Sequence, residues 1–179
     1  ISMIHPKKVG HVVLKARDIN QAEKFYTEVL GFQIVMRLKQ PRGVFFSLGE
    51  QHHDLAVLEV PLGSDDPKMD QVSLHHVALQ VEDFAALKDS YRTLKQHLRF
   101  RRASSTSSEA LKDSYRTLKQ HGVEIIRAVD HGVTKSIYFC DPAGNRLELY
   151  CDVGEDGLAQ IRRQSEQSIM DFPPLNLEA

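Results

Sequence analysis

One stretch decides the fold: Tyr138-Phe139-Cys140-Asp141-Pro142-Ala143-Gly144-Asn145-Arg146-Leu147-Glu148-Leu149-Tyr150. Two β-rich runs flank a cluster of Asp, Pro, Gly and Asn, which is typical of a β-hairpin because these residues supply a fixed φ and a position able to take positive φ. With the Asp-Pro-Ala-Gly-Asn segment as the loop, Cys140 pairs with Arg146 and Tyr138 lies opposite Glu148. Cross-strand partners share a face of a sheet, so the sequence predicts a phenol beside a carboxylate.

Glu148 lies in the middle of the second predicted strand, between Leu147 and Leu149. A carboxylate at such a position is costly to bury unless it has a partner. A cation or a metal ion on that face of the sheet would supply one. The alternative is a strand with one solvated face, which leaves the carboxylate in water.

The composition limits the class of protein. The chain has 179 residues, enough for one well-buried domain or for two half-size modules that share a core. Its net charge of −1 and pI near 6.8 argue against a nucleic-acid-binding or membrane-surface protein, because neither sign of charge dominates. No apolar run approaches the roughly 20 residues of a spanning helix, and no signal segment is recognisable. We expect a soluble, cytoplasmic protein without nucleic-acid or membrane partners.

The two cysteines, Cys140 and Cys151, are expected to be free thiols. In the predicted register Cys151 faces Lys135 rather than Cys140, and a reducing compartment keeps thiols unpaired.

The first part of the chain predicts a β-α-β-β-β module. Strands are expected over residues 9–16, 32–38, 43–48 and 54–60. Between the first two strands, an apolar stripe at helical spacing predicts a helix that Asp18 or Asn20 caps and Gly31 closes. His11 lies in the first strand, and the pair His52-His53 introduces the last one.

The pattern then restarts. We expect the first module at residues 4–62, a linker rich in Gly, Ser, Asp and Pro at 63–72, the second module at 73–152 and a C-terminal tail at 153–179. The second module opens with a strand at 73–81 that carries His75 and His76. A helix ending before Gly122, a strand at 123–128 and the hairpin complete it.

The second module contains an exact internal repeat. The segment Ala-Leu-Lys-Asp-Ser-Tyr-Arg-Thr-Leu-Lys-Gln-His at residues 86–97 recurs at residues 110–121. The module therefore carries about 24 additional residues, which correspond equally to 98–121 or 86–109. A recent tandem duplication, an engineered insertion and a cloning error all explain an identical repeat. Both copies carry an apolar stripe, so we expect one to fill the single helix position and the other to be displaced or to lengthen the helix.

With the additional residues subtracted, the two modules align. His76 and Glu148 are then separated by as many residues as His11 and Glu59. The repeat therefore maps His11 onto His76 and Glu59 onto Glu148. Pseudo-two-fold symmetry would bring these four side chains to one place if the sheets curve around a common cavity.

Two βαβββ modules, a histidine in each first strand and the sequence Asp-Pro-Ala-Gly-Asn-Arg-Leu-Glu at residues 141–148 resemble the vicinal oxygen chelate superfamily. That superfamily includes extradiol ring-cleaving dioxygenases, glyoxalase I, methylmalonyl-CoA epimerase and fosfomycin-resistance proteins. The resemblance covers roughly residues 8–152 apart from the repeated 24. It implies an α+β fold in which two modules pair into curved mixed sheets around a metal cavity, with His11, His76 and Glu148 as metal ligands.

The chain looks most similar to small single-domain extradiol dioxygenases, and this resemblance implies roles for three further residues. His53 matches their acid/base residue, and Tyr138, ten residues before the carboxylate ligand, matches a residue that orients the substrate together with His131. Histidine suits a proton relay because its pKa lies near neutrality. Two imidazoles and one carboxylate with open positions suit the oxygen chemistry of Fe(II), the favoured metal.

Glu59 favours a different reaction. In glyoxalase I and the epimerase a glutamate at this position is implied to be a fourth ligand or a base, with Zn, Ni, Co or Mn as the Lewis acid. A metal-free binding module of the bleomycin-resistance type is a third alternative. We expect an extradiol-type dioxygenase of a small catecholic molecule, and the family's habit implies a homodimer.

Overall fold

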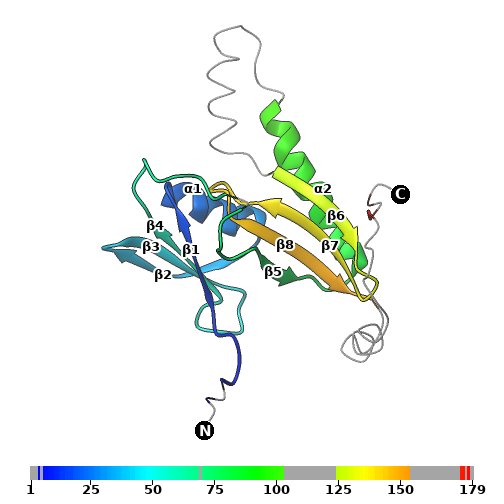
Figure 1. Ribbon diagram of the computed structural model, residues 1–179, viewed down its shortest axis with the longest axis horizontal. Coiled ribbons are helices and arrows are strands. Elements are labelled where there is room, and N and C mark those ends of the chain that lie inside the picture. The colour runs from blue at the N-terminus through cyan, green and yellow to red at the C-terminus, as the bar shows by residue number, and fades with distance from the viewer. Residues whose placement is uncertain are drawn as a thin grey trace, which may run out of the picture. The chain divides into compact units, whose positions relative to one another are not determined.

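The computed structural model describes residues 4, 6–68, 70–102, 124–153, 174, 175 and 177, with the side chains of 95–102 and 124 left aside. The chain divides into two compact units, Ile1–Asp66 and Pro67–Ala179. Each unit contains a β-α-β-β-β module with one four-stranded mixed sheet, as Figure 1 shows. The expected α+β fold with two modules is confirmed.

In the first unit the strand order is β1-β4-β3-β2. The elements are β1 (Val12–Ala16), α1 (Ile19–Lys24), a π-helical turn η1 (Phe25–Val29), β2 (Gln33–Lys39), β3 (Arg42–Ser47) and β4 (Leu55–Glu59). Strand β1 runs parallel to β4, and the other neighbours are antiparallel.

Helix α1 begins where the sequence predicts. The carboxylate of Asp18 accepts hydrogen bonds from the backbone N–H groups of Asn20 and Gln21, at 3.0 and 3.1 Å. These bonds satisfy donors that have no partner inside the helix. Beyond η1 the chain reverses at Gly31, whose φ of +75° is costly for a residue with a Cβ atom. The expected cap and the expected closing glycine are confirmed.

One face of the first sheet is buried by the helix. Leu14 and Ala16 of β1 are buried, whereas Val13 and Lys15, which alternate with them, are exposed. This alternation is the period-2 pattern of a strand that packs on one side only. Helix α1 packs against β3 and β4, and an aromatic cluster fills the space beside it. The cluster consists of Phe25, Tyr26, Phe32 and Phe46.

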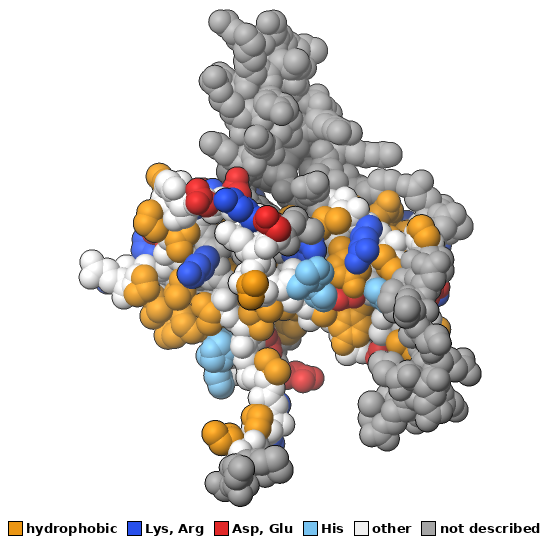
Figure 2. All heavy atoms as spheres, in the orientation of Figure 1, with side chains coloured by type: hydrophobic (Ala, Val, Ile, Leu, Met, Phe, Trp, Pro, Cys, Tyr) orange, Lys and Arg blue, Asp and Glu red, His pale blue; other side chains and the backbone are white. Residues whose placement is uncertain are grey.

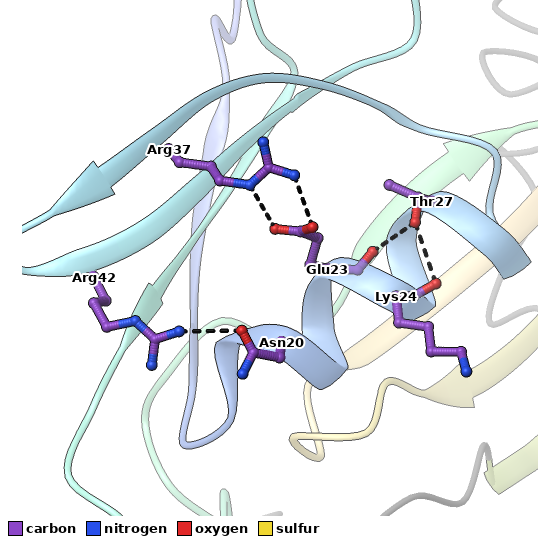
Figure 3. Close-up of polar contacts among 6 residues, drawn as sticks. All are labelled: Asn20, Glu23, Lys24, Thr27, Arg37 and Arg42. Carbon is purple, nitrogen blue, oxygen red and sulfur yellow. Dashed lines mark hydrogen bonds and ion pairs between the residues drawn. The ribbon is translucent and has the colours of Figure 1, made fainter.

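A bidentate ion pair joins α1 to β2. The guanidinium of Arg37 donates from Nε and Nη2 to the two carboxylate oxygens of Glu23, at 2.9 and 2.8 Å (Figure 3). The hydrogen bond from Arg37 lowers the pKa of Glu23, although partial burial of the carboxyl group opposes the shift. The pair therefore stabilises the folded state only while Glu23 is ionised.

In the second unit the strand order is β5-β8-β7-β6. Its elements are β5 (Val77–Gln80), α2 (Phe84–Arg102), β6 (Glu124–Asp130), β7 (Thr134–Cys140) and β8 (Arg146–Asp152). Strand β5 runs parallel to β8, and the remaining pairs are antiparallel. Because β5 starts at Val77 rather than at residue 73, His75 and His76 precede the strand instead of lying inside it.

The central hairpin has the predicted register. Cys140 pairs with Arg146, Tyr138 with Glu148 and Lys135 with Cys151. Both cysteines are free thiols, as expected.

Asp141 closes the loop of this hairpin. Its side chain, in a residue only 2% exposed, accepts hydrogen bonds from the backbone N–H groups of Ala143 and Asn145 and from Asn145 Nδ2. Gly144 supplies the positive φ, +87°. The loop chemistry therefore fixes the register of β7 against β8.

Helix α2 contains the first copy of the repeated segment. Asp83 accepts a hydrogen bond from the backbone N–H of Ala86 at 2.7 Å, and Leu87 and Leu94 of the apolar stripe are fully buried. The helix packs against β6, β7 and β8. The first copy therefore fills the helix position, and the second copy, residues 110–121, lies outside the described residues.

None of the described helices is long and apolar enough to cross a membrane.

Replacing Asp141 by Ala should destabilise the second unit by about 1–3 kcal/mol, because partly buried loop N–H groups lose their acceptor. Urea unfolding monitored by circular dichroism measures the change. Asp141→Asn keeps one acceptor oxygen and should lose less, and Asp65→Ala, at an exposed loop position, is the control. Equal stability of Asp141→Ala and the parent would contradict this role of the loop.

Replacing Glu23 by Gln should change how stability depends on pH. A carboxyl group whose pKa is lowered on folding adds stability above its ordinary pKa of 4.5, and this contribution disappears as the pH falls through the folded-state pKa. The parent should therefore be modestly more stable than Glu23→Gln at pH 7, and the difference should vanish near pH 3. Urea midpoints at both pH values test this. A difference that stays constant with pH would exclude the ionised pair as its cause.

Candidate metal and substrate site

The register of the second sheet brings three candidate residues to one face. Tyr138 lies opposite Glu148, and Glu148 lies beside Ala78 of β5. His76, two residues before Ala78, continues the same face. Leu147 and Leu149 lie on the other face and are buried. Glu148 is thus fixed between two core residues while its own side chain is directed away from them.

Glu148 is nearly buried and its partner is a histidine. The residue is 7% exposed, and its Oε2 lies 2.8 Å from Nε2 of His76. The structure therefore supplies the partner that a carboxylate at this position requires. On its other side, His76 contacts His75, with the two Nδ1 atoms 2.6 Å apart.

Tyr138 completes this cluster. Its hydroxyl lies 3.0 Å from Nε2 of His131, and its ring contacts the ring of His76 edge to face, with centroids 5.4 Å apart. Burial raises the pKa of Tyr138 to about 12, and a hydrogen bond to the negatively charged Glu148 acts in the same direction. The phenol is therefore neutral at physiological pH and serves as a donor or acceptor of hydrogen bonds rather than as a phenolate.

Two of the predicted residues meet in the first unit. The rings of His11 and His53 lie 4.3 Å apart between centroids, and His53 packs edge to face against Phe45. Nδ1 of His53 lies 2.5 Å from Nδ1 of His52. His11 and His52 are exposed, and Figure 2 shows histidine side chains at the molecular surface.

The imidazole of His53 is half-buried and incompletely bonded. Its Nε2 is buried and makes no hydrogen bond to any of the residues that the structure describes. Burial lowers the pKa of His53, and the nearby imidazoles of His11 and His52 lower it further. A neutral imidazole with one unpaired nitrogen is suited to accept or to donate a proton.

Glu59 does not occupy the place that residue counting assigns to it. It pairs in register with Ala16, so its side chain lies on the same face of the sheet as those of Leu14 and Ala16. The alternating residues that follow His11, Val13 and Lys15, lie on the other face. Its Oε1 accepts a hydrogen bond from Nη1 of Arg42 at 2.7 Å. The same guanidinium reaches Asn20 of α1, as Figure 3 shows.

The position that corresponds to Glu148 is held by Ala56. Val13 pairs with Ala56 in the first sheet as Ala78 pairs with Glu148 in the second, and each lies two residues after the module's histidine. Even after the repeated residues are subtracted, the second module is longer than the first between its histidine and the paired residue of its last strand. Counting equal numbers of residues from each histidine therefore pointed to the wrong residue.

The donor atoms of His76 and Glu148 suit a divalent metal. Ligands on adjacent positions of a metal with bonds near 2.1 Å have their donor atoms about 3 Å apart, close to the 2.8 Å observed here. One imidazole and one carboxylate are ordinary ligands of such ions. Within either described unit, no group of three or more His, Cys, Asp or Glu side chains is arranged to hold a metal.

Sequence reasoning missed two cationic neighbours of this cluster, Arg127 and Arg146. Arg127 lies opposite Tyr138, with Cζ 4.9 Å from the ring centroid, and Arg146 donates from Nη1 to Nε2 of His75 at 2.9 Å. The hairpin register could have placed Arg146, which is two residues before Glu148. A β-bulge between Ile125 and Arg127 interrupts the alternation of side chains along β6, so the sequence does not show which face Arg127 occupies.

The sequence profile of the Glyoxalase/Bleomycin resistance protein/Dioxygenase superfamily matches residues 8–149. Biphenyl-2,3-diol 1,2-dioxygenase 2 from Rhodococcus globerulus is 30% identical over 146 residues, which are 81% of this chain and 63% of that protein. The chain thus spans less than two thirds of this relative. Mitochondrial methylmalonyl-CoA epimerase from Mus musculus is 32% identical over 89 residues, covering 44% and 48%.

Solved structures show the same fold. The fosfomycin resistance protein FosX from Listeria monocytogenes, in complex with Mn(II) and sulfate ion, matches with a TM-score of 0.57 and 17% identity, over 88% of this chain and 99% of its own. The profile match extends over both βαβββ modules and includes His11, His76 and Glu148. The chain belongs to the Glyoxalase/Bleomycin resistance protein/Dioxygenase superfamily.

Proposed function

We propose that this chain is a metal-dependent enzyme that cleaves the ring of a catecholic substrate in the manner of an extradiol dioxygenase. The observation that carries the proposal is the nearly buried pair of His76 and Glu148 beside the neutral phenol of Tyr138. The similarity to a biphenyl-2,3-diol dioxygenase supports this choice of reaction.

In this proposal His11, His76 and Glu148 hold the metal, and Fe(II) is the favoured ion. Two imidazoles and one carboxylate leave coordination positions open, where Fe(II) would supply binding of both catechol oxygens and of dioxygen. The remaining work falls to side chains of the protein, which bind the substrate, orient it and move protons.

His53 is the proposed acid and base. Its buried, unpaired Nε2 would take a proton from a catechol hydroxyl and return it later to reduced oxygen. Tyr138 and His131, joined at 3.0 Å, would orient the substrate through the phenol hydroxyl. Because Tyr138 remains neutral, it can donate a hydrogen bond to a substrate oxygen without adding a negative charge beside Glu148.

An isomerase of the epimerase or glyoxalase kind is the second candidate, favoured by the 32% identity to the mouse epimerase. That reaction would use a Lewis-acid metal with Glu59 as a further ligand or base. The ion pair of Glu59 with Arg42, on the same face as Ala16, weighs against this role. The dioxygenase remains the better supported of the two.

Oxygen uptake after anaerobic loading with Fe(II) tests the reaction. We expect uptake with a neutral catechol and a yellow ring-cleavage product, and His53→Ala should lower the rate by at least about 100-fold because the proton relay is lost. His52→Ala removes the exposed neighbouring imidazole and should stay within a few-fold of the parent. No uptake despite stoichiometric iron would reject the dioxygenase and call for an isomerase assay with Ni(II) or Co(II), with Glu59→Gln as its control.

Metal affinity tests the ligands separately from the reaction. We expect metal binding to weaken by about 10- to 100-fold or more in each of three variants, His11→Ala, His76→Ala and Glu148→Gln. Loss of a residue that only hydrogen-bonds to a metal ligand already costs about 10- to 100-fold in affinity. Titration calorimetry with Mn(II) measures the affinity, and circular dichroism checks the fold. Glu28→Gln, at an exposed position on η1, is the control. Unchanged affinity in Glu148→Gln would exclude this carboxylate as a ligand.

A further inference from the structure

Positive charge collects on the face of the second sheet that carries Tyr138 and Glu148. Arg127 of β6 pairs in register with Tyr138, so the two side chains share this face. The guanidinium stacks over the phenol ring, with Cζ 4.9 Å from the ring centroid. Arg127, Tyr138 and Glu148 thus form one row across β6, β7 and β8.

Arg127 is exposed, and its hydrogen-bonding capacity is unused within the described part of the chain. Among those residues its guanidinium makes the ring contact and neither a hydrogen bond nor an ion pair. Stacking on an aromatic ring holds the guanidinium plane in place while its N–H groups remain available at the edge. An arginine held in this way is preorganised to bind a planar anion.

A second guanidinium lies on the same face. Arg146 precedes Glu148 by two residues on β8 and donates to His75 at 2.9 Å. The carboxylate of Glu148 contacts His76 and Tyr138.

This arrangement favours a carboxylate as the missing partner. A carboxylate presents two oxygens in a plane and matches the fork of a guanidinium, which binds it by two parallel hydrogen bonds. In a catechol that carries a carboxylate para to one of its hydroxyls, as in 3,4-dihydroxybenzoate, the anion lies across the ring from the diol. Such a molecule would reach Arg127 while its diol remains beside Tyr138.

We propose that Arg127 is a specificity-determining residue that binds a carboxylate substituent of the substrate, with Arg146 adding positive charge. The substrate class is then a catechol that bears a carboxylate, in preference to a neutral catechol. The catechol part of this statement rests on the proposed function, whereas binding of the anion rests on the described face of the second unit.

The test compares two ligands of the same shape and different charge, 3,4-dihydroxybenzoate and 3,4-dihydroxybenzamide. Calorimetric titration of the 179-residue chain under nitrogen measures binding without turnover. We expect the parent to bind the acid at least about tenfold more tightly than the amide, as a charge-assisted bidentate pair would provide. Arg127→Gln should remove this preference by weakening binding of the acid much more than binding of the amide, and Arg127→Lys should retain part of the preference.

Arg92→Gln is the matched control, because Arg92 is an exposed arginine on α2 that pairs with Asp89. It should keep the full preference for the acid. Equal binding of acid and amide by the parent, no detectable binding of either, or an unchanged preference in Arg127→Gln would each overturn the proposal.

Oxygen uptake with 4-methylcatechol separates this proposal from the proposed function. Uptake without any Arg127-dependent preference for the acid would leave the dioxygenase in place and reject the role of Arg127. Preference for the acid that depends on Arg127, without uptake for any catechol, would keep the anion site and reject the dioxygenase.

Discussion

The interaction on which the second unit depends is the contact of Glu148, in strand β8, with His76, directly before strand β5. A carboxylate that is 7% exposed needs a partner, and the parallel pairing of β5 with β8 brings His76 to it. The loop held by Asp141 sets the register of β7, which brings Tyr138 to the same carboxylate. A shift of one residue would move Glu148 to the helix-covered face.

The two modules share a topology and divide the chemistry unequally. The second carries a carboxylate, an imidazole and a neutral phenol on one sheet face. The first carries the histidine pair of His11 and His53, and an alanine where the second has its carboxylate. Its glutamate, Glu59, is tied to Arg42 instead. Of the two described modules, the second thus has an acidic residue at this position of its sheet and the first does not.

The sequence predicts local features of this fold well and non-local ones poorly. The hairpin register follows from its turn residues, and the start of α1 follows from the capping aspartate, because each depends on neighbours in the chain. The equivalence of Glu59 and Glu148 failed because counting assumes equal loop lengths. The place of Arg127 beside Tyr138 could not be predicted because a bulge next to it interrupts the alternation of side chains along β6. The contact between His76 and Glu148 needs a parallel pairing of distant strands, which no local pattern specifies.

The central claim, that His76 and Glu148 are neighbouring ligands of a metal, is tested most directly by an anomalous difference map from crystals grown with Mn(II). The account predicts one strong peak within about 2.2 Å of both His76 Nε2 and a carboxylate oxygen of Glu148, in the range of ordinary metal–ligand bonds. A map without a peak at this pair, with the direct 2.8 Å contact retained and Mn(II) bound elsewhere, would contradict it.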